Sequence, residues 1–251
     1  YETLAPHWDK YQQFDLHYEY FKVIYEKYLR SFASNLNNCH NEDHSLRYWR
    51  ILIGPWLYMF IGILYDRYLS IKSAIDSNRV TNTWIPCLKP EQWVSLSTYD
   101  IVELSGGNDN FNLYLYGRLI SKLGEIPFEL KEDESFFNPL KDSENKSRSA
   151  HPKIARAVLQ KIIKIIPERF FRIIICASGL SRLNNLKLIL SLGQFPFISP
   201  LIPPYRISIK EDLRKNIILP EETDEFESCL NELVVEQLPV STCEGYEGLR
   251  D

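Results

Sequence analysis

The stretch HSLRYWRILIGPWLYMFIGILYDR, residues 44–67, decides the fold of this chain. Residues 51–65 in it carry no charge and lie between an Arg- and His-rich segment and an Asp-Arg pair. As one helix this uncharged block would be about 22 Å long, short of the roughly 30 Å hydrocarbon layer of a bilayer. It therefore predicts a buried helix and no transmembrane span. Gly54-Pro55 predicts a joint between two helices, because proline fits the first position of a helix but not its interior.

Composition indicates an ordinary globular protein. The 251 residues are 45% hydrophobic and 25% charged, which is enough for one large domain or two modest ones. The net charge of −4 provides no overall positive field, so nucleic acid is not an expected partner. The five cysteines include no C-x-x-C pair and do not suggest a disulfide framework. Reduced thiols and a cytoplasmic location are therefore expected.

Hydrophobic spacing predicts the secondary structure. Apolar residues three or four apart predict an amphipathic helix over residues 12–37, and the helix after the joint is expected to run to about residue 76, surrounded by protein. Further helices are predicted at 110–123, 154–166, 184–192 and 221–235, and strands at 83–88, 100–104, 126–130, 169–177, 195–199 and 238–240.

The order of these elements predicts an α/β fold. Residues 169–199 are expected to form a β-α-β unit, which is typical of a parallel sheet. We therefore expect a helix-rich N-terminal part packed on a Rossmann-like parallel sheet. The expected division is a helix-rich α/β part at 1–130, a polar loop or linker at 131–152 and a Rossmann-like part at 153–251, together one continuous domain.

A basic group next to the uncharged block is a candidate substrate-binding site. His44, Arg47 and Arg50 are spaced three apart, so on a helix they would lie along one side. Arginine offers a planar set of donors that matches phosphate or carboxylate, so an anionic sugar or a nucleotide diphosphate would suit them. The alternative is that the arginines pair with Glu42, Asp43 or other carboxylates on the surface.

A second candidate binding site is the turn at Ser178 and Arg182. It follows a predicted parallel strand and precedes a helix, the position where open α/β sheets bind ligands. Arg182 is the expected contact to an anion, whereas Ser181 or Asn184 is expected to cap the helix. The paired spacing of His40 and His44 lacks the H-E-x-x-H order, so no metal site is expected.

Two carboxylates are candidate general bases. Asp66 lies about 25 Å from Arg50 along an unbroken helix, so the two share a site only if the Gly-Pro joint bends sharply. With a shallow bend, Asp66 and Arg67 form a structural pair. Glu244 follows the last predicted strand and is a candidate base for an acceptor hydroxyl, or the cap of a following helix.

Several motifs resemble one bacterial transferase family, encoded in O-antigen and surface-polysaccharide gene clusters. The signature is Tyr48-Trp49-Arg50-Ile51-Leu52, Gly54-Pro55-Trp56-Leu57 and Tyr65-Asp66-Arg67-Tyr68. Supporting matches are Pro6-His7-Trp8-Asp9, Asn38 with His40 and His44, Leu238-Pro239, and Glu244-Gly245-Tyr246. The resemblance therefore extends over nearly the whole chain.

The resemblance implies that this chain is a fragment, truncated at both ends and inactive alone. It would be the acceptor-side half of a two-domain glycosyltransferase and would bind a sugar or glycolipid acceptor. The other half would bind a nucleotide-sugar donor. No tightly bound cofactor is expected. The resemblance thus implies a protein located in the cytoplasm, at the inner face of the membrane, in peripheral contact with it. The alternatives are a non-catalytic binding or scaffold module of a polysaccharide-assembly complex, and a nucleotide-dependent enzyme of unrelated chemistry that uses the Ser178 turn.

Overall fold

The computed structural model describes residues 11–87, 93–98, 100–132, 170, 181–194 and 209–246. The chain divides into two compact units, residues 1–143 with 207–251, and residues 144–206. The predicted linker at 131–152 lies almost entirely outside the described residues. The helix predicted at 154–166 and the strand predicted at 195–199 also lie outside them, and of the strand predicted at 169–177 only residue 170 is described. These predictions, and the division that depends on them, stay predictions.

The first helix, α1, spans Tyr11–His40 and confirms the predicted amphipathic helix. Its end is a Schellman motif with Asn41 in the left-handed conformation, at a φ of 53°. The amide of Glu42 donates to the carbonyl of Asn37 at 2.9 Å, and the amide of Asn41 donates to the carbonyl of Asn38 at 3.4 Å. This reversal turns the chain back so that the next helix packs against α1.

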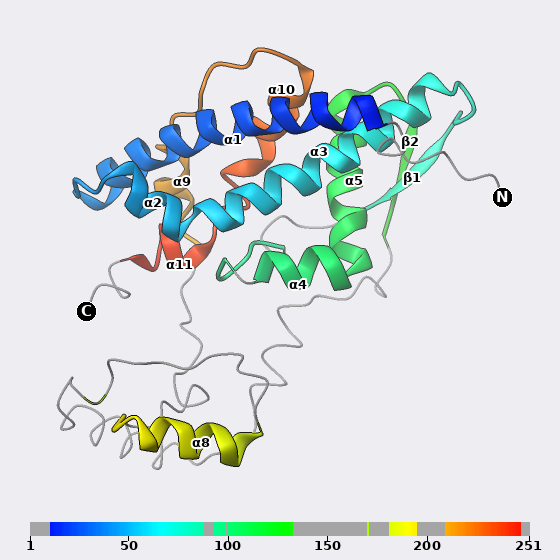
Figure 1. Cartoon of the computed structure of the whole chain (residues 1–251). Coiled ribbons are helices and arrows are strands. Elements are labelled where there is room, and N and C mark those ends of the chain that lie inside the picture. Colours follow the sequence, from blue (N-terminus) through cyan, green and yellow to red (C-terminus); the bar gives the residue numbers. More distant parts are fainter. Residues whose placement is uncertain are drawn as a thin grey trace. The chain divides into compact units, whose positions relative to one another are not determined.

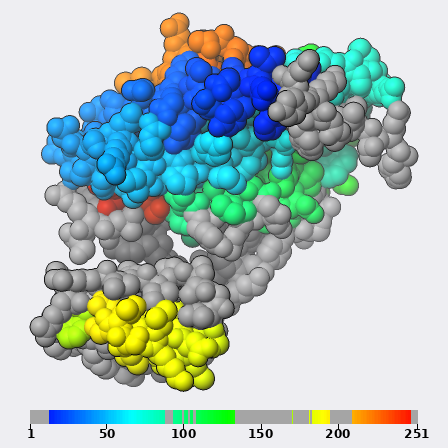
Figure 2. Space-filling model, viewed as in Figure 1, coloured from blue at the N-terminus to red at the C-terminus, as the bar shows by residue number. Residues whose placement is uncertain are grey.

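The Gly-Pro joint is confirmed. Helix α2 spans Leu46–Leu52 and α3 spans Gly54–Asp76, with proline in the first turn of α3. A Cβ on Gly54 would lie 2.8 Å from the hydroxyl of Tyr25, so glycine allows the close approach of α1. Figure 2 shows the side chains of α1 and of the α2–α3 pair forming a continuous face. Within the described ranges, no helix has both the length and the apolar character needed to cross a membrane.

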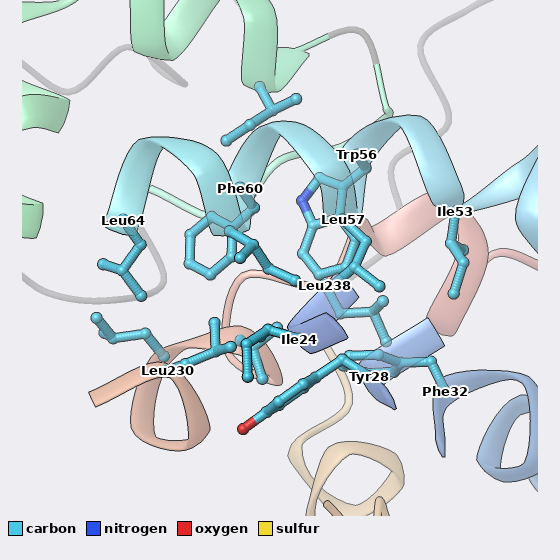
Figure 3. Close-up of a cluster of buried hydrophobic side chains, with 14 of the residues drawn as sticks. Ile24, Tyr28, Phe32, Ile53, Trp56, Leu57, Phe60, Leu64, Leu230 and Leu238 are labelled. Carbon is cyan, nitrogen blue, oxygen red and sulfur yellow. The ribbon is translucent and has the colours of Figure 1, made fainter. Parts of the chain in front are cut away.

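The hydrophobic core lies between α1, α3 and α10, which spans Glu225–Val234. Figure 3 shows apolar side chains of these three helices facing one another, with Leu238 from the following segment completing the cluster. Trp56, Phe60 and Phe32 are fully buried, and the rings of Trp56 and Phe60 stack 5.7 Å apart. The prediction that α3 is surrounded by protein is wrong for its other side, because Tyr58 of this helix is exposed, as is Ile51 in the same uncharged block.

A small parallel sheet lies beside α5. Strands β1 (Thr83–Pro86) and β2 (Phe128–Lys131) confirm two of the predicted strands, and α4 (Asp100–Gly107) and α5 (Asp109–Leu123) connect them (Figure 1). A Cβ on Gly117 of α5 would lie 3.3 Å from the Cβ of Ile85, so glycine allows β1 to pack close to the helix. The molecule is therefore a helix-rich α/β protein with a two-stranded parallel sheet in its described part.

Two predicted strands are wrong. Residues 100–104 begin α4, because Asp100 accepts the amide of Ser97 at 2.8 Å and opens a helical turn, and an apolar run this short suits either structure. Residues 238–240 lead into the short helix α11 (Val240–Cys243), with Pro239 immediately before it. The amide of Val240 donates to the carbonyl of Ser95, so this segment is held by a loop rather than by a sheet.

The remaining described helices are short. Helix α9 spans Glu211–Lys215, where we predicted no helix. In the second unit, α8 spans Arg182–Ser191, and the Ser181 side chain accepts the amide of Asn184, as expected of a cap. The helix predicted at 221–235 is confirmed as α10.

Candidate functional site

Imidazole and phenol side chains gather where the end of α1, the start of α2 and the segment after α11 meet. The Nε2 atom of His44 lies 2.7 Å from the hydroxyl of Tyr246, and that hydroxyl lies 3.0 Å from the hydroxyl of Tyr48. We call this group the imidazole–phenol cluster; its members are His40, His44, Tyr48, Trp49 and Tyr246. It joins two motifs that lie about 200 residues apart in the sequence.

Asn37, in the last turn of α1, fixes the backbone that carries His44. Its side-chain oxygen accepts the amide of His44 at 3.0 Å and the indole N–H of Trp49 at 2.8 Å. Its side-chain nitrogen donates to the carbonyl of His44 at 2.9 Å. Because both backbone groups of His44 are bound, the loop between α1 and α2 holds the backbone of His44 in one position.

The imidazole of His44 has one nitrogen held and one available. Its ring stacks on Tyr48 with centroids 3.9 Å apart, and 31% of the side chain is exposed. A carboxylate oxygen of Glu42 lies 3.5 Å from Nε2, the nitrogen that also faces Tyr246. Among the described residues, Nδ1 of His44 has no hydrogen-bond partner. Because the Glu42 carboxylate can only accept, it favours the tautomer in which Nε2 carries the proton. In that tautomer Nδ1 can accept a proton, as a general base does.

His40 supports the other side of the cluster. Its ring stacks on Tyr246 with centroids 4.3 Å apart, and its Nε2 lies 3.2 Å from the carbonyl oxygen of Thr242. A carbonyl oxygen can only accept, so Nε2 of His40 carries a proton. His40 therefore ties α1 to α11 and holds the phenol that faces His44.

The thiols next to the cluster are not suited to nucleophilic chemistry. Burial raises the pKa of the Cys243 thiol to about 12, and burial also raises the pKa of the Cys39 thiol. The thiolate is the reactive form, and neither thiol forms it readily at neutral pH. The chemistry of this site therefore rests on the imidazole and phenol groups.

The three predicted basic residues have different surroundings. His44 lies before α2, which begins at Leu46, and turns toward Tyr246. Arg50 forms a bidentate ion pair with Glu26 of α1, with one contact of 2.9 Å. This is the alternative in which an arginine pairs with a carboxylate. Arg47 is exposed and makes no ion pair or side-chain hydrogen bond within the described part of the chain, so its guanidinium is available to a ligand.

Asp66 lies on a different part of α3 from the cluster. Its carboxylate accepts from the guanidinium of Arg67, which also donates to Asn112 of α5 at 2.8 Å. These contacts correspond to the structural pair that we expected with a shallow bend at the joint. Arg50 contacts α1 and Arg67 contacts α5, so the structure does not bring these two arginines together. A catalytic role for Asp66 stays a prediction.

The side chain of Glu244 is fully buried beside Arg214. Its two carboxylate oxygens accept from the guanidinium at 2.7 and 2.9 Å, and one of them also accepts the amide of Lys210 at 3.1 Å. A catalytic role for Glu244 stays a prediction that requires this ion pair to open. Ser178 lies outside the described residues, and Arg182 begins α8 with a side chain outside them, so their binding roles also stay predictions.

The sequence did not indicate two residues that shape the site. Asn37 continues the apolar and polar pattern of α1, and nothing in its spacing distinguishes it from a surface residue. Tyr246 belongs to the quoted Glu-Gly-Tyr motif, but we assigned the chemistry of that motif to its carboxylate. Within the described ranges, no three His, Cys, Asp or Glu side chains lie together as metal ligands would.

The fold and the site define a helix-rich α/β protein with a histidine-centred cluster at a helix junction. The family model of the LIC12162 family transferase matches residues 1–251, so the chain belongs to this transferase family. The prediction that it resembles a transferase family is thereby confirmed at that level. No curated protein and no solved structure matches the chain.

Proposed function

We propose that this chain is the acceptor-side half of a sugar transferase in bacterial O-antigen or surface-polysaccharide biosynthesis, with His44 as the general base. Membership of a transferase family supports group-transfer chemistry. The observation that carries the proposal is the available Nδ1 of His44 on a ring whose Nε2 is held by Tyr246. A positioned base at the attacking oxygen accelerates transfer to a hydroxyl.

The proposed step uses the neutral imidazole of His44. Nδ1 accepts the proton of an acceptor hydroxyl while the acceptor oxygen forms a bond to the anomeric carbon of the donor sugar. The bond from that carbon to the phosphate oxygen breaks, and the nucleoside diphosphate, or CMP in the case of a CMP-sugar, leaves with the electron pair. Glu42, whose carboxylate is 3.5 Å from Nε2, stabilises the resulting imidazolium, as an acid beside a catalytic histidine does.

Arg47 is the proposed contact for the anionic part of a substrate. It is exposed, lies three residues from His44, and its charge is not neutralised by another described side chain. A free guanidinium near the base matches the negative charge that develops on a leaving phosphate. Arg50 has its charge balanced by Glu26, and we propose that it supports α2 and binds an anion only if that pair opens.

The remaining parts of the proposal rest on the resemblance. The two-stranded parallel sheet is compatible with part of a Rossmann-like domain. By the resemblance, a second half would bind most of the nucleotide-sugar donor, and we propose that Ser178 and Arg182 of this chain contact substrate. The acceptor would be a sugar or a glycolipid. We propose that the protein acts in the cytoplasm, in peripheral contact with the inner face of the membrane.

The test is turnover by the full-length gene product with a panel of UDP-, GDP-, dTDP- and CMP-sugars. Release of the free nucleotide is measured, because slow transfer to water needs no knowledge of the acceptor. His44→Gln is expected to lower kcat by about 10²- to 10⁴-fold, and Arg47→Ala to raise KM. His17→Gln is the matched control, because His17 lies about 35 Å along α1 from His40. Turnover of His44→Gln close to wild type, with the fold intact, would refute the proposed base.

The alternative is a non-catalytic scaffold module of a polysaccharide-assembly complex. The observation that favours it is that Arg50 and Glu244, two of the predicted site residues, are in ion pairs with Glu26 and Arg214. If no sugar nucleotide binds or reacts, and His44→Gln and Arg47→Ala change neither stability nor binding of nucleotides, the scaffold explains the cluster better. A crosslinked partner that is lost on Arg47→Ala would then identify its docking site.

A further inference from the structure

Arg214 of α9 uses every donor of its guanidinium inside the protein. Nε donates to one Glu244 oxygen at 2.7 Å, and Nη2 donates to the other at 2.9 Å. Nη1 and Nη2 also donate, each at 2.8 Å, to the carbonyls of Val235, Glu236 and Leu238. Guanidinium has five N–H groups, and these five contacts use all of them. Only 8% of the arginine side chain is exposed.

Glu244 depends on Arg214 for its charge. The glutamate side chain has no exposed surface, and it also accepts the amide of Lys210. A buried carboxylate without its cation is strongly unfavourable, so loss of Arg214 would force this side chain to move. That movement alters the turn that Glu244 begins.

That turn positions the phenol of the imidazole–phenol cluster. The amides of Glu244 and Gly245 both donate to the carbonyl of Val240, at 3.0 and 2.8 Å, and Tyr246 follows directly. Tyr246 is only 4% exposed, and its hydroxyl contacts His44 at 2.7 Å. A shift of about 1 Å at Tyr246 would break this hydrogen bond, because such bonds weaken rapidly beyond their normal length.

We infer that Arg214 is a positioning residue that acts on His44 through Glu244 and Tyr246. The guanidinium of Arg214 binds Glu244 and so fixes the turn that positions the Tyr246 phenol. That phenol contacts Nε2 of His44, so that Nδ1 of the same ring keeps one orientation. The structural part of this inference stands on the hydrogen bonds alone, and only its effect on turnover rests on the proposed function. Preorganised groups of this kind raise kcat because the reacting atoms need no rearrangement.

The test is the ¹⁵N chemical shifts and tautomer pattern of the His44 ring in Arg214→Lys. Lysine keeps the charge but cannot make the paired contacts of arginine. The chain has five histidines, so His44 is assigned by its loss in His44→Gln. We expect Arg214→Lys to change the Nε2 shift of His44 in the same direction as Tyr246→Phe, which removes the phenol hydroxyl directly. Arg118→Lys is the matched control, since Arg118 makes comparable ion pairs with Glu232 and Glu236.

Each outcome decides the inference. One outcome is that Tyr246→Phe alters the ¹⁵N chemical shifts of the His44 ring, whereas Arg214→Lys lowers thermal stability but leaves those shifts unchanged in the folded protein. In that case Arg214 is only a structural residue and the inference is wrong. If Arg214→Lys does not fold, Glu244→Gln is measured in its place with the same expectation. If the nucleotide sugars are not turned over by the wild type, the proposed function fails, and the ring shifts still decide the positioning role. Where turnover is found, we expect Arg214→Lys to lower kcat at least ~10-fold with little change in KM.

Discussion

The ion pair between Lys27 and Glu227 predicts a large loss of stability when the lysine is removed. The Nζ of Lys27 lies 2.7 and 2.9 Å from the two carboxylate oxygens of Glu227, and it also donates to the carbonyl of Glu221 at 2.6 Å. The Glu227 side chain is fully buried, whereas 27% of the Lys27 side chain is exposed. The pair joins α1 to α10 across the hydrophobic core.

The magnitude follows from what Glu227 keeps when Lys27 is replaced by Met. Breaking a fully buried pair costs about 3–5 kcal/mol because one charge is left unpaired. Here the carboxylate keeps the amide and hydroxyl of Thr223, at 2.5 and 2.7 Å, and lies in the first turn of α10. These donors and the helix dipole offset part of the loss, so we expect Lys27→Met to lower the free energy of unfolding by about 2–3 kcal/mol.

The assay is urea unfolding followed by far-UV circular dichroism. Glu227→Gln and the double variant complete a cycle that isolates the coupling between the two side chains. Lys22→Met is the matched control, because Lys22 pairs with Glu19 on the exposed surface of the same helix and should change stability little. A loss below about 1 kcal/mol for Lys27→Met, or a coupling no larger than that of an exposed pair, would refute the reasoning.

Two further predictions concern titratable groups. The hydrogen-bonded guanidinium of Arg50 lowers the pKa of Glu26 in the folded protein. The pair therefore stabilises the fold fully at pH values above the pKa of glutamate in the unfolded chain, about 4.3. This stabilisation is lost as the pH falls through the lower pKa of Glu26 in the folded state. The free energy of unfolding of Glu26→Gln should thus be lower than that of the wild type at neutral pH, by at most about 1 kcal/mol because the pair is exposed. This difference should vanish in acid. A difference that stays constant with pH would contradict the prediction. Burial raises the pKa of the Cys229 thiol to about 11, whereas Cys87 is exposed. Iodoacetamide should therefore modify Cys87 in the native protein and Cys229 only after denaturation, as measured by peptide mass spectrometry. Equal labelling of the two thiols in the native protein would contradict this prediction.

The long helices could be predicted because their pattern repeats over many turns. In α1 the apolar residues recur along the whole helix, and in the α2–α3 joint proline leaves few alternatives. Residues 100–104 and 238–240 are too short for a period to be measured, so their structure is set by neighbours such as Ser97 and the loop at Ser95. Tertiary contacts, not local preference, determine these segments.

The candidate site was only partly predictable, because spacing shows which residues share a helix but not which partners they meet. The motifs at 44–50 and 244–246 were both identified, and the structure brings His44 and Tyr246 together. From the sequence we predicted that the charged residues of these motifs are the functional ones. Arg50 and Glu244 in fact meet Glu26 and Arg214, which lie 24 and 30 positions away on other elements. Such pairs become visible only when the elements are packed.

The contacts between α1 and α10 also have a consequence during protein synthesis. Lys27 and Glu227 are 200 positions apart, so α1 leaves the ribosome long before its partner exists. At about 5–20 residues per second, the apolar stripe of the first helices waits roughly 10–40 s for α10. During that interval the nascent chain exposes its aromatic side chains to chaperones, and the N-terminal helices gain their full core only after α10 has been made.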